Sequence, residues 1–173
     1  DTFSQLSPIG TVAQRALYVV KDHKVQRIRD PGSRDDLEDV EVSLPRPEQI
    51  AVNRAQDEVA ATTNSGTRLM VGKVGSDKLT VLRTGESGLI RPDYARNGEL
   101  WSPAAAGRTE LAVFKGGQRL KVRFGTNSVP EATIEAFSVS PDGARVAIIV
   151  RKDGQSVVGL ARIERSEGTI TLS

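Results

Sequence analysis

Few residues in this chain could support acid–base or metal chemistry. The sole histidine, His23, lies between Asp22 and Lys24 in a predicted exposed hairpin turn, and no G-x-S-x-G motif accompanies it. With one histidine and no cysteine, a conventional zinc site is excluded. Neither G-x-G-x-x-G nor G-x-x-x-x-G-K-[ST] occurs, so phosphate binding has no signature. We therefore predict no catalytic residues, no metal site and no cofactor.

Paired carboxylates do not change this prediction. Asp57 and Glu58 are adjacent on a predicted strand and would point to opposite faces, so they cannot act as an acid/base pair. Asp142 and Asp153 each precede a glycine. They could be carboxylates near a central channel, but we interpret them as turn residues that cap the backbone.

A long acidic segment, Asp30–Pro47, interrupts the pattern of the chain. Its carboxylates could in principle hold a hard cation, but they lack the D-x-D-x-D-G spacing of a calcium loop. We interpret the segment as a solvated loop between blades. The residues concerned are Asp35, Asp36, Glu38, Asp39 and Glu41.

The composition is that of a soluble globular domain. Of 173 residues, 38% are hydrophobic and 27% charged, and only 4% are aromatic, so Val, Ile, Leu and Ala must build the core. The net charge of +2 argues neither for nor against nucleic acid. No apolar run in these 173 residues approaches the length of a membrane span, and we recognise no signal-peptide pattern among them. Because the chain begins at Asp1, we expect a piece or a processed product of a longer protein.

The clearest pattern is a strand–turn–strand unit at Phe137–Val150 (FSVSPDGARVAIIV). Pro141 and Gly143 suit a tight turn, and the β-branched residues that follow suit a buried strand. The same unit can be laid over Ile50–Thr63 and Ile90–Ser102.

This unit recurs at spacings of 41 and 46 residues when Val59, Leu100 and Val146 are equivalent. Repeats of about 40–50 residues with four strands each are typical of β-propeller blades. We predict an all-β fold of antiparallel four-stranded repeats, about three and a half blades of a partial propeller, with Ser140–Gly143 as a tight turn. A helix over Pro47–Ala61 is the alternative for the first repeat.

The predicted organisation is one partial propeller domain. Its parts are the end of a preceding blade (1–29, with strands near Leu17–Val20 and Val25–Ile28), an acidic inter-blade loop (30–48) and blade repeats at 49–84, 85–127 and 128–173.

Inner and outer strands differ in pattern. Ile148 lies in a two-sided apolar run and is predicted to be core. In the predicted outermost strand Arg119–Phe124, three basic residues alternate with three apolar ones. The basic stripe could be a nucleic-acid surface, but no aromatic residues interleave with it. We interpret it as a solvated sheet edge that discourages edge-to-edge pairing.

Two aromatic residues belong to the second repeat. Trp101 is predicted to be core between blades. Tyr94, close to a loop, is the candidate for contact with a partner.

Two segments resemble the β-propeller domain of the actinobacterial lipoprotein LpqB family. Leu89–Trp101 (LIRPDYARNGELW) resembles that family's L-x-R-P-S-W-D-x-x-G-x-V-W segment, and Phe137–Val150 resembles its R-V-S-P-D-G-x-R-V-A segment. The chain departs from the first at Asp93 and Tyr94, and Asn53-Arg54-Ala55-Gln56 replaces S-P-D-G in the first repeat.

The resemblance implies a non-catalytic, extracytoplasmic binding module of a surface lipoprotein, held at the cell membrane by a lipid anchor outside this chain. It also implies a protein partner, the extracellular part of the sensor histidine kinase of the MtrA–MtrB two-component system, with an influence on cell division and envelope homeostasis. No nucleic-acid partner is expected. The alternative is a propeller-type hydrolase or sugar-acting enzyme whose catalytic residues lie partly outside this chain.

Propellers close with about 4–8 blades, because each blade's faces are covered by its neighbours. We therefore expect this chain to be part of a larger ring and its end blades to carry uncovered apolar faces. Taken alone, it should cover those faces by self-association or with its own terminal segments.

Overall fold

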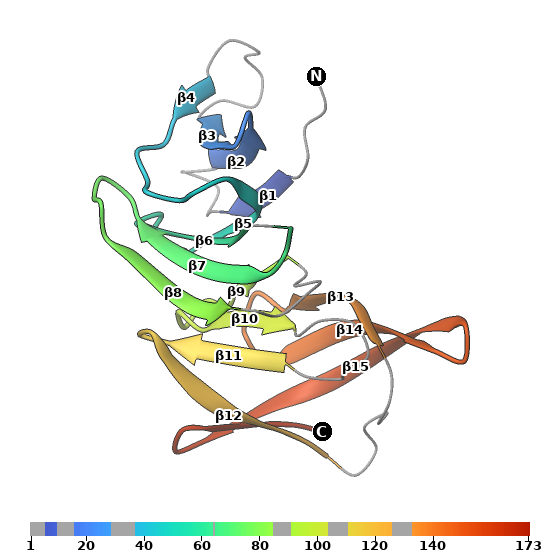
Figure 1. Ribbon diagram of the computed structural model, residues 1–173. Coiled ribbons are helices and arrows are strands. Elements are labelled where there is room, and N and C mark those ends of the chain that lie inside the picture. The colour runs from blue at the N-terminus through green and yellow to red at the C-terminus, as the bar shows by residue number, and fades with distance from the viewer. Residues whose placement is uncertain are drawn as a thin grey trace. The chain divides into compact units, whose positions relative to one another are not determined.

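The computed structural model describes residues 6–9, 16–28, 37–63, 65–84, 91–103, 111–125 and 133–173. All regular elements in these ranges are β-strands, so the predicted all-β fold class is confirmed (Figure 1). The same ranges contain no helix long and apolar enough to cross a membrane. The chain divides into two compact units, Asp1–Gly85 and Glu86–Ser173, which we describe separately.

Unit 1 contains two antiparallel four-stranded sheets with strand orders β1-β2-β3-β4 and β5-β6-β7-β8. Their strands are β1 (Leu6–Ile9), β2 (Ala16–Lys21), β3 (Lys24–Ile28), β4 (Leu37–Asp39), β5 (Pro47–Val52), β6 (Glu58–Thr63), β7 (Arg68–Lys73) and β8 (Leu79–Thr84). The first sheet contains the predicted hairpin of β2 and β3 and, in addition, β1 and β4. Strand β4 lies within the segment that we predicted as an acidic loop. The helical alternative over Pro47–Ala61 is wrong, because β5 pairs with β6 and Ile50 lies opposite Ala61.

The two sheets of unit 1 share one apolar core. It combines Tyr18, Val20 and Val25 with residues of β5 and β6 such as Ile50 and Val59. The coil after β4 packs closely on β7 as well, since a Cβ built on Gly72 would lie 2.5 Å from Val42 Cγ2. Only glycine allows the coil to approach β7 this closely.

Unit 2 is a single eight-stranded sheet in the order β13-β14-β15-β16-β12-β11-β10-β9. Its strands are β9 (Asp93–Tyr94), β10 (Leu100–Pro103), β11 (Leu111–Lys115), β12 (Gln118–Phe124), β13 (Thr133–Val139), β14 (Arg145–Lys152), β15 (Gln155–Ser166) and β16 (Thr169–Leu172).

The second and third repeats join where β12 and β16 pair in parallel. Lys121 N donates to Gly168 O at 2.9 Å, and Gly125 N donates to Leu172 O at 2.7 Å. The prediction of antiparallel four-stranded repeats did not include this parallel pairing, which joins two repeats in one sheet.

Strand β12 is therefore not an edge, and the prediction of a solvated sheet edge at Arg119–Phe124 is wrong. It pairs with β11 on one side and β16 on the other. The predicted alternation is confirmed, since Leu120, Val122 and Phe124 are partly buried while Arg119, Lys121 and Arg123 are exposed.

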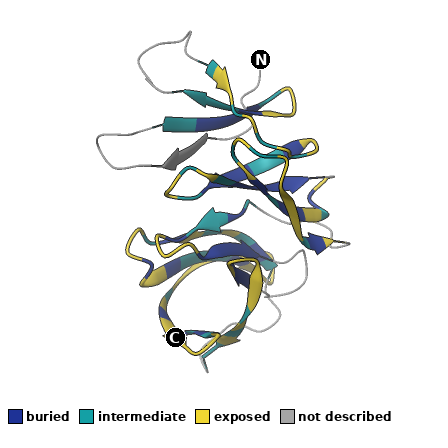
Figure 2. Cartoon of the chain, turned by 90° about the vertical axis from the view of Figure 1, so that its left-hand side faces the viewer, coloured by how far each residue is buried: buried dark blue, intermediate teal, exposed yellow. Residues whose placement is uncertain are grey.

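The unit 2 sheet curls, as Figure 2 shows near the C-terminus. Its outer strands β9 and β13 contact each other. Val139 N of β13 donates to Asp93 Oδ2 of β9 at 3.1 Å. The enclosed core includes Trp101, Val113, Val146, Ile163 and Ile170. Trp101 is fully buried, which agrees with its predicted place in the core.

Ile148 is less buried than predicted. It is half-buried and packs against the core cluster of unit 2. Its partner on β15 is Gly159, which has no side chain to cover it. The fully buried position of this strand is Val146.

One turn geometry recurs in all three repeats. The amide of Gln56 donates to Asn53 O, that of Gly98 to Ala95 O, and that of Gly143 to Ser140 O, at 2.7–3.0 Å. The donating residue has a positive φ each time: 59° for Gln56, 78° for Gly98 and 70° for Gly143. Such a backbone favours glycine, and Gln56 is held there by Tyr18, whose hydroxyl donates to Gln56 Oε1 at 2.8 Å.

We predict that Ile170→Ala destabilises the protein by about 2–5 kcal/mol, because the side chain is 1% exposed in the core beside β12. Lys121→Ala, on the exposed face of β12, should change stability by less than about 0.5 kcal/mol. Urea denaturation measures both, and equal midpoints for the two variants would contradict the assigned inner and outer faces.

Candidate interaction surface

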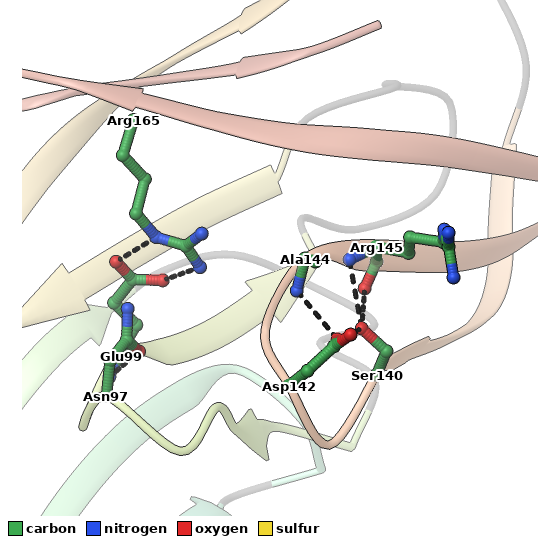
Figure 3. A network of polar contacts seen from close by, with 7 residues as sticks. All are labelled: Asn97, Glu99, Ser140, Asp142, Ala144, Arg145 and Arg165. Carbon is green, nitrogen blue, oxygen red and sulfur yellow. Dashed lines mark hydrogen bonds and ion pairs between the residues drawn. The ribbon is translucent and has the colours of Figure 1, made fainter.

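Two hairpin turns lie close to Arg165, near the end of β15, at one end of the unit 2 sheet (Figure 3). We call this group the hairpin end; it comprises Ala95–Glu99, Ser140–Ala144 and the turn that follows β15, Ser166–Gly168. Ile163 N of β15 donates to Ala144 O at 2.8 Å, and Glu99 binds Arg165 at the end of β15. These bonds tie turns that lie far apart in the sequence.

The Glu99–Arg165 ion pair connects β10 to β15. Arg165 Nε and Nη2 donate to the two carboxylate oxygens of Glu99, each at 2.8 Å. The Glu99 side chain is 2% exposed, whereas that of Arg165 is 33% exposed. This bidentate geometry is the strongest form of a charge-assisted hydrogen bond.

Burial by itself would raise the pKa of Glu99, but the hydrogen bonds and charge of Arg165 outweigh it and hold that pKa below its ordinary value. Hydrogen bonding to Glu99 likewise raises the pKa of Arg165. Glu99 therefore stays ionised and fully engaged. Such a carboxylate suits a positioning role rather than proton transfer.

The Ser140–Ala144 turn is held by its own side chains. Asp142 Oδ1 accepts hydrogen bonds from Ser140 Oγ at 2.5 Å and from Ala144 N at 2.9 Å. The bonds from Ser140 and Ala144 lower the pKa of Asp142. Asp142 is thus the turn residue that we predicted. Asp153 lies in the exposed β14–β15 turn at φ 50°.

In the equivalent turn of the first repeat, Asn53 caps the backbone in place of Ser140 and Asp142. Its Oδ1 accepts from Asp57 N at 3.1 Å and from Glu58 N at 3.2 Å, and its Nδ2 donates to Asp57 Oδ1 at 2.6 Å. Asp57 is occupied in the turn and Glu58 begins β6. The Asp57 carboxylate and the Glu58 backbone amide are therefore both part of the turn.

The hairpin end displays polar side chains on a rigid base. Arg96, Asn97, Asp142 and Glu167 are exposed, while the backbone that carries them is fixed by turn hydrogen bonds. Tyr94, the predicted contact residue, is half-buried in β9 opposite Leu100 and directly precedes the first turn. Exposed side chains on fixed turns are a common arrangement of binding surfaces.

The other candidates lie in unit 1. His23 is exposed in the β2–β3 turn at φ 59°. Glu38 accepts from Arg27 at 2.9 Å, and Asp39 accepts from Gln26 at 2.7 Å and from Lys24 at 3.3 Å. These bonds fasten β4 to β3.

Asp35 and Asp36 lie outside the described residues. Within the residues that the structure describes, no three His, Asp or Glu side chains come together so that they could hold a metal ion.

Sequence reasoning missed Asp93, Glu99 and Arg165. Burial raises the pKa of Asp93, whose carboxylate accepts the β13 amide of Val139. The sequence does draw attention to Asp93, since this aspartate stands where the resembled family segment has serine. Nothing in the spacing of Glu99 and Arg165, 66 residues apart, marks them as partners.

Comparison with known families gives a match over nearly the whole chain. Residues 14–172 match the family described as the lipoprotein LpqB beta-propeller domain. Lipoprotein LpqB of Streptomyces avermitilis is 30% identical over an alignment of 125 residues that covers 66% of this chain and 20% of that protein. Lipoprotein LpqB of Cutibacterium acnes is 25% identical over 105 residues, 61% of this chain and 17% of that protein. The aligned part thus spans about a fifth of the length of these relatives.

Solved structures show the same fold at low identity. Hydrazine synthase of Kuenenia stuttgartiensis matches with a TM-score of 0.67 and 13% identity, covering 97% of this chain and 47% of that one. Hsv2 of Kluyveromyces lactis matches with a TM-score of 0.55 and 13% identity, covering 91% and 57%. At this identity the likeness concerns the fold alone.

We predict unequal costs for breaking the ion pair. Arg165→Gln should destabilise the protein by about 3–5 kcal/mol, because it leaves a buried carboxylate unpaired. Glu99→Gln should cost less, about 1–3 kcal/mol, because the partly exposed Arg165 can bind water instead.

The pH dependence follows from the lowered pKa of Glu99. The pair's contribution is present above the ordinary glutamate value of 4.5 and is lost as the pH falls through the lower folded pKa. Wild-type stability should therefore fall more steeply than that of Glu99→Gln below about pH 4.5 in urea titrations. Parallel curves would contradict the assignment.

Proposed function

The chain belongs to the lipoprotein LpqB beta-propeller domain family, and from this premise we propose that it is a non-catalytic binding module of a surface lipoprotein. The observation that carries the proposal is the family match over residues 14–172. Two relatives that bear the name lipoprotein LpqB support it.

The hairpin end supports a binding role. The buried carboxylate of Glu99 is neutralised by Arg165, and the exposed carboxylate of Asp142 caps a turn, so both have structural roles. What it offers to solvent is a set of polar and charged side chains on turns that are already ordered. A surface that is ordered before binding loses less conformational entropy when a partner docks.

The proposed partner is the extracellular part of the sensor histidine kinase of an MtrA–MtrB two-component system, as the family resemblance implies. The proposed location is extracytoplasmic, with membrane attachment through a lipid anchor outside this chain. Tyr94 and Arg96 are the proposed contact residues, because one lies beside the first turn of the hairpin end and the other is exposed in it.

Binding of the purified chain to the kinase's extracellular part, measured by biolayer interferometry, tests the proposal. Tyr94→Ala should weaken binding about tenfold, which corresponds to losing an anchor worth more than 1 kcal/mol. Arg96→Glu should weaken it as well, without the loss of stability that truncating a half-buried ring can bring.

Lys152→Glu is the matched control, since it reverses the charge of an exposed side chain at the end of β14 that lies opposite to the Ser140–Ala144 turn. It should bind like the wild type. No binding by the wild type would contradict the partner, and equal losses in Arg96→Glu and Lys152→Glu would contradict the location.

A further inference from the structure

The outer strands of the unit 2 sheet meet without a backbone ladder. Strands β9 and β13 contact each other, yet they stand at opposite ends of the strand order and do not pair within the described residues. A side chain bridges them, since Val139 N donates to Asp93 Oδ2 at 3.1 Å. We call this place the seam; it comprises Asp93 of β9 and Val139 of β13. The curled sheet is therefore joined at the seam through a carboxylate.

The seam lies at the base of the hairpin end. On one side, Tyr94 is the next residue after Asp93 and leads directly into the Ala95–Glu99 turn. On the other side, Val139 is followed at once by the Ser140–Ala144 turn. Each turn is held in shape by its own hydrogen bonds. The bond across the seam therefore helps to fix the spacing between the two turns.

The surroundings of the Asp93 carboxylate disfavour its charge. Asp93 is half-buried, and the fully buried Trp101 lies opposite it on β10. Burial raises the pKa of the carboxyl and outweighs the opposing hydrogen bonds of the Val139 and Tyr94 amides and the positive charge of Arg91. A carboxylate in such a place costs more to ionise than one in open solvent. The seam therefore closes more readily around a protonated Asp93 than around an ionised one.

The acidic groups on the neighbouring elements are engaged elsewhere. At the start of β10, Glu99 is bound by Arg165, which lowers its pKa. In the turn after β13, Asp142 accepts hydrogen bonds within its own turn, and these lower its pKa as well. On β13 itself, Glu135 is paired with Arg151. Above about pH 4.5, the seam carboxyl should therefore dominate the pH response of this region.

We propose that Asp93 is a positioning residue whose protonation tightens the seam and makes the hairpin end sensitive to pH. The proposal rests on the proposed binding function, because it concerns the regulation of the same surface. Protonation favours the closed seam, which holds the two turns at their observed spacing, and ionisation at neutral pH weakens that preference. A surface with this fixed spacing loses less conformational entropy when a partner docks.

The sign of the pH effect follows from the raised pKa. Protonation contributes fully to closure of the seam below the ordinary aspartate value of 3.8, and this contribution is lost as the pH rises through the higher folded value. The resembled family segment has serine in place of Asp93, and serine does not titrate in this range. A chain with that serine should therefore lack the response.

NMR on the purified wild type tests the seam without any partner. The carboxyl carbon of Asp93 should titrate with a midpoint above 3.8. The protection factor of the Val139 amide should fall by more than about threefold from about pH 4.5 to neutral pH. Asp93→Asn is a neutral isostere that can still accept this amide, so its protection factor should not change with pH. Asp153→Asn, which alters an exposed aspartate in the β14–β15 turn, is the matched control and should keep the wild-type response.

Affinity for the proposed kinase partner tests whether the seam regulates binding. In biolayer interferometry at neutral pH, Asp93→Asn should bind more than about twofold more tightly than the wild type, because it mimics the protonated state. The difference should shrink at about pH 4.5, where the wild type becomes protonated more often. Comparing the two proteins at each pH cancels any titration of the partner.

A midpoint at or below 3.8, or a Val139 response that persists in Asp93→Asn, would overturn the proposal. Loss of the response in Asp153→Asn as well would also overturn it, since the response would then not belong to the seam. Equal affinities of wild type and Asp93→Asn at neutral pH would overturn the regulation of binding. Absence of binding by both proteins at every pH would contradict the proposed function instead, and the NMR result would still decide the role of Asp93.

Discussion

The parallel pairing of β12 with β16 determines the rest of unit 2. Each repeat on its own is an antiparallel sheet with two free edges, and this one contact turns two repeats into an eight-stranded sheet. Once β12 is paired on both sides, the sheet can curl and enclose Trp101, Val146 and Ile170 in one core. The Val139–Asp93 hydrogen bond then joins the remaining outer strands. The side of β13–β15 that faces away from this core remains uncovered.

The curl of the unit 2 sheet also brings two charged side chains together. It brings the start of β10 close to the end of β15, so that Glu99 is buried beside Arg165. A buried carboxylate without a partner would be strongly destabilising, and the bidentate guanidinium supplies both hydrogen bonds and charge. The same ion pair orders the hairpin end, on which the proposed binding function depends. Structure and proposed function are therefore connected through a single pair of side chains.

The local structure of the repeats could be predicted from sequence because it depends on neighbours in the chain. The Ser140–Gly143 turn, the alternation along β12 and the burial of Trp101 follow from turn residues and a period of two. Asn53 shows the same principle, since a different side chain caps an equivalent turn.

What could not be predicted depends on contacts that are distant in sequence. An alternating strand has the same pattern whether it lies at an edge or between two strands, so β12 gave no sign of its pairing with β16. Ile148 is less buried than its apolar neighbours suggest, because Gly159 lies opposite it. Glu99 and Arg165 are ordinary surface residue types, and only the curl of the sheet makes them partners. Tyr94 remains a prediction as a contact residue.

Amide hydrogen exchange by NMR tests the central claim most directly. The amides of Lys121 and Gly125 point from the β12 side toward carbonyl groups at Gly168 and Leu172. If the two repeats form one sheet, these amides should exchange as slowly as those between β14 and β15. If Lys121 and Gly125 exchange at the rate of an unpaired edge while the β14–β15 amides stay protected, the repeats are separate sheets and the account of unit 2 is wrong.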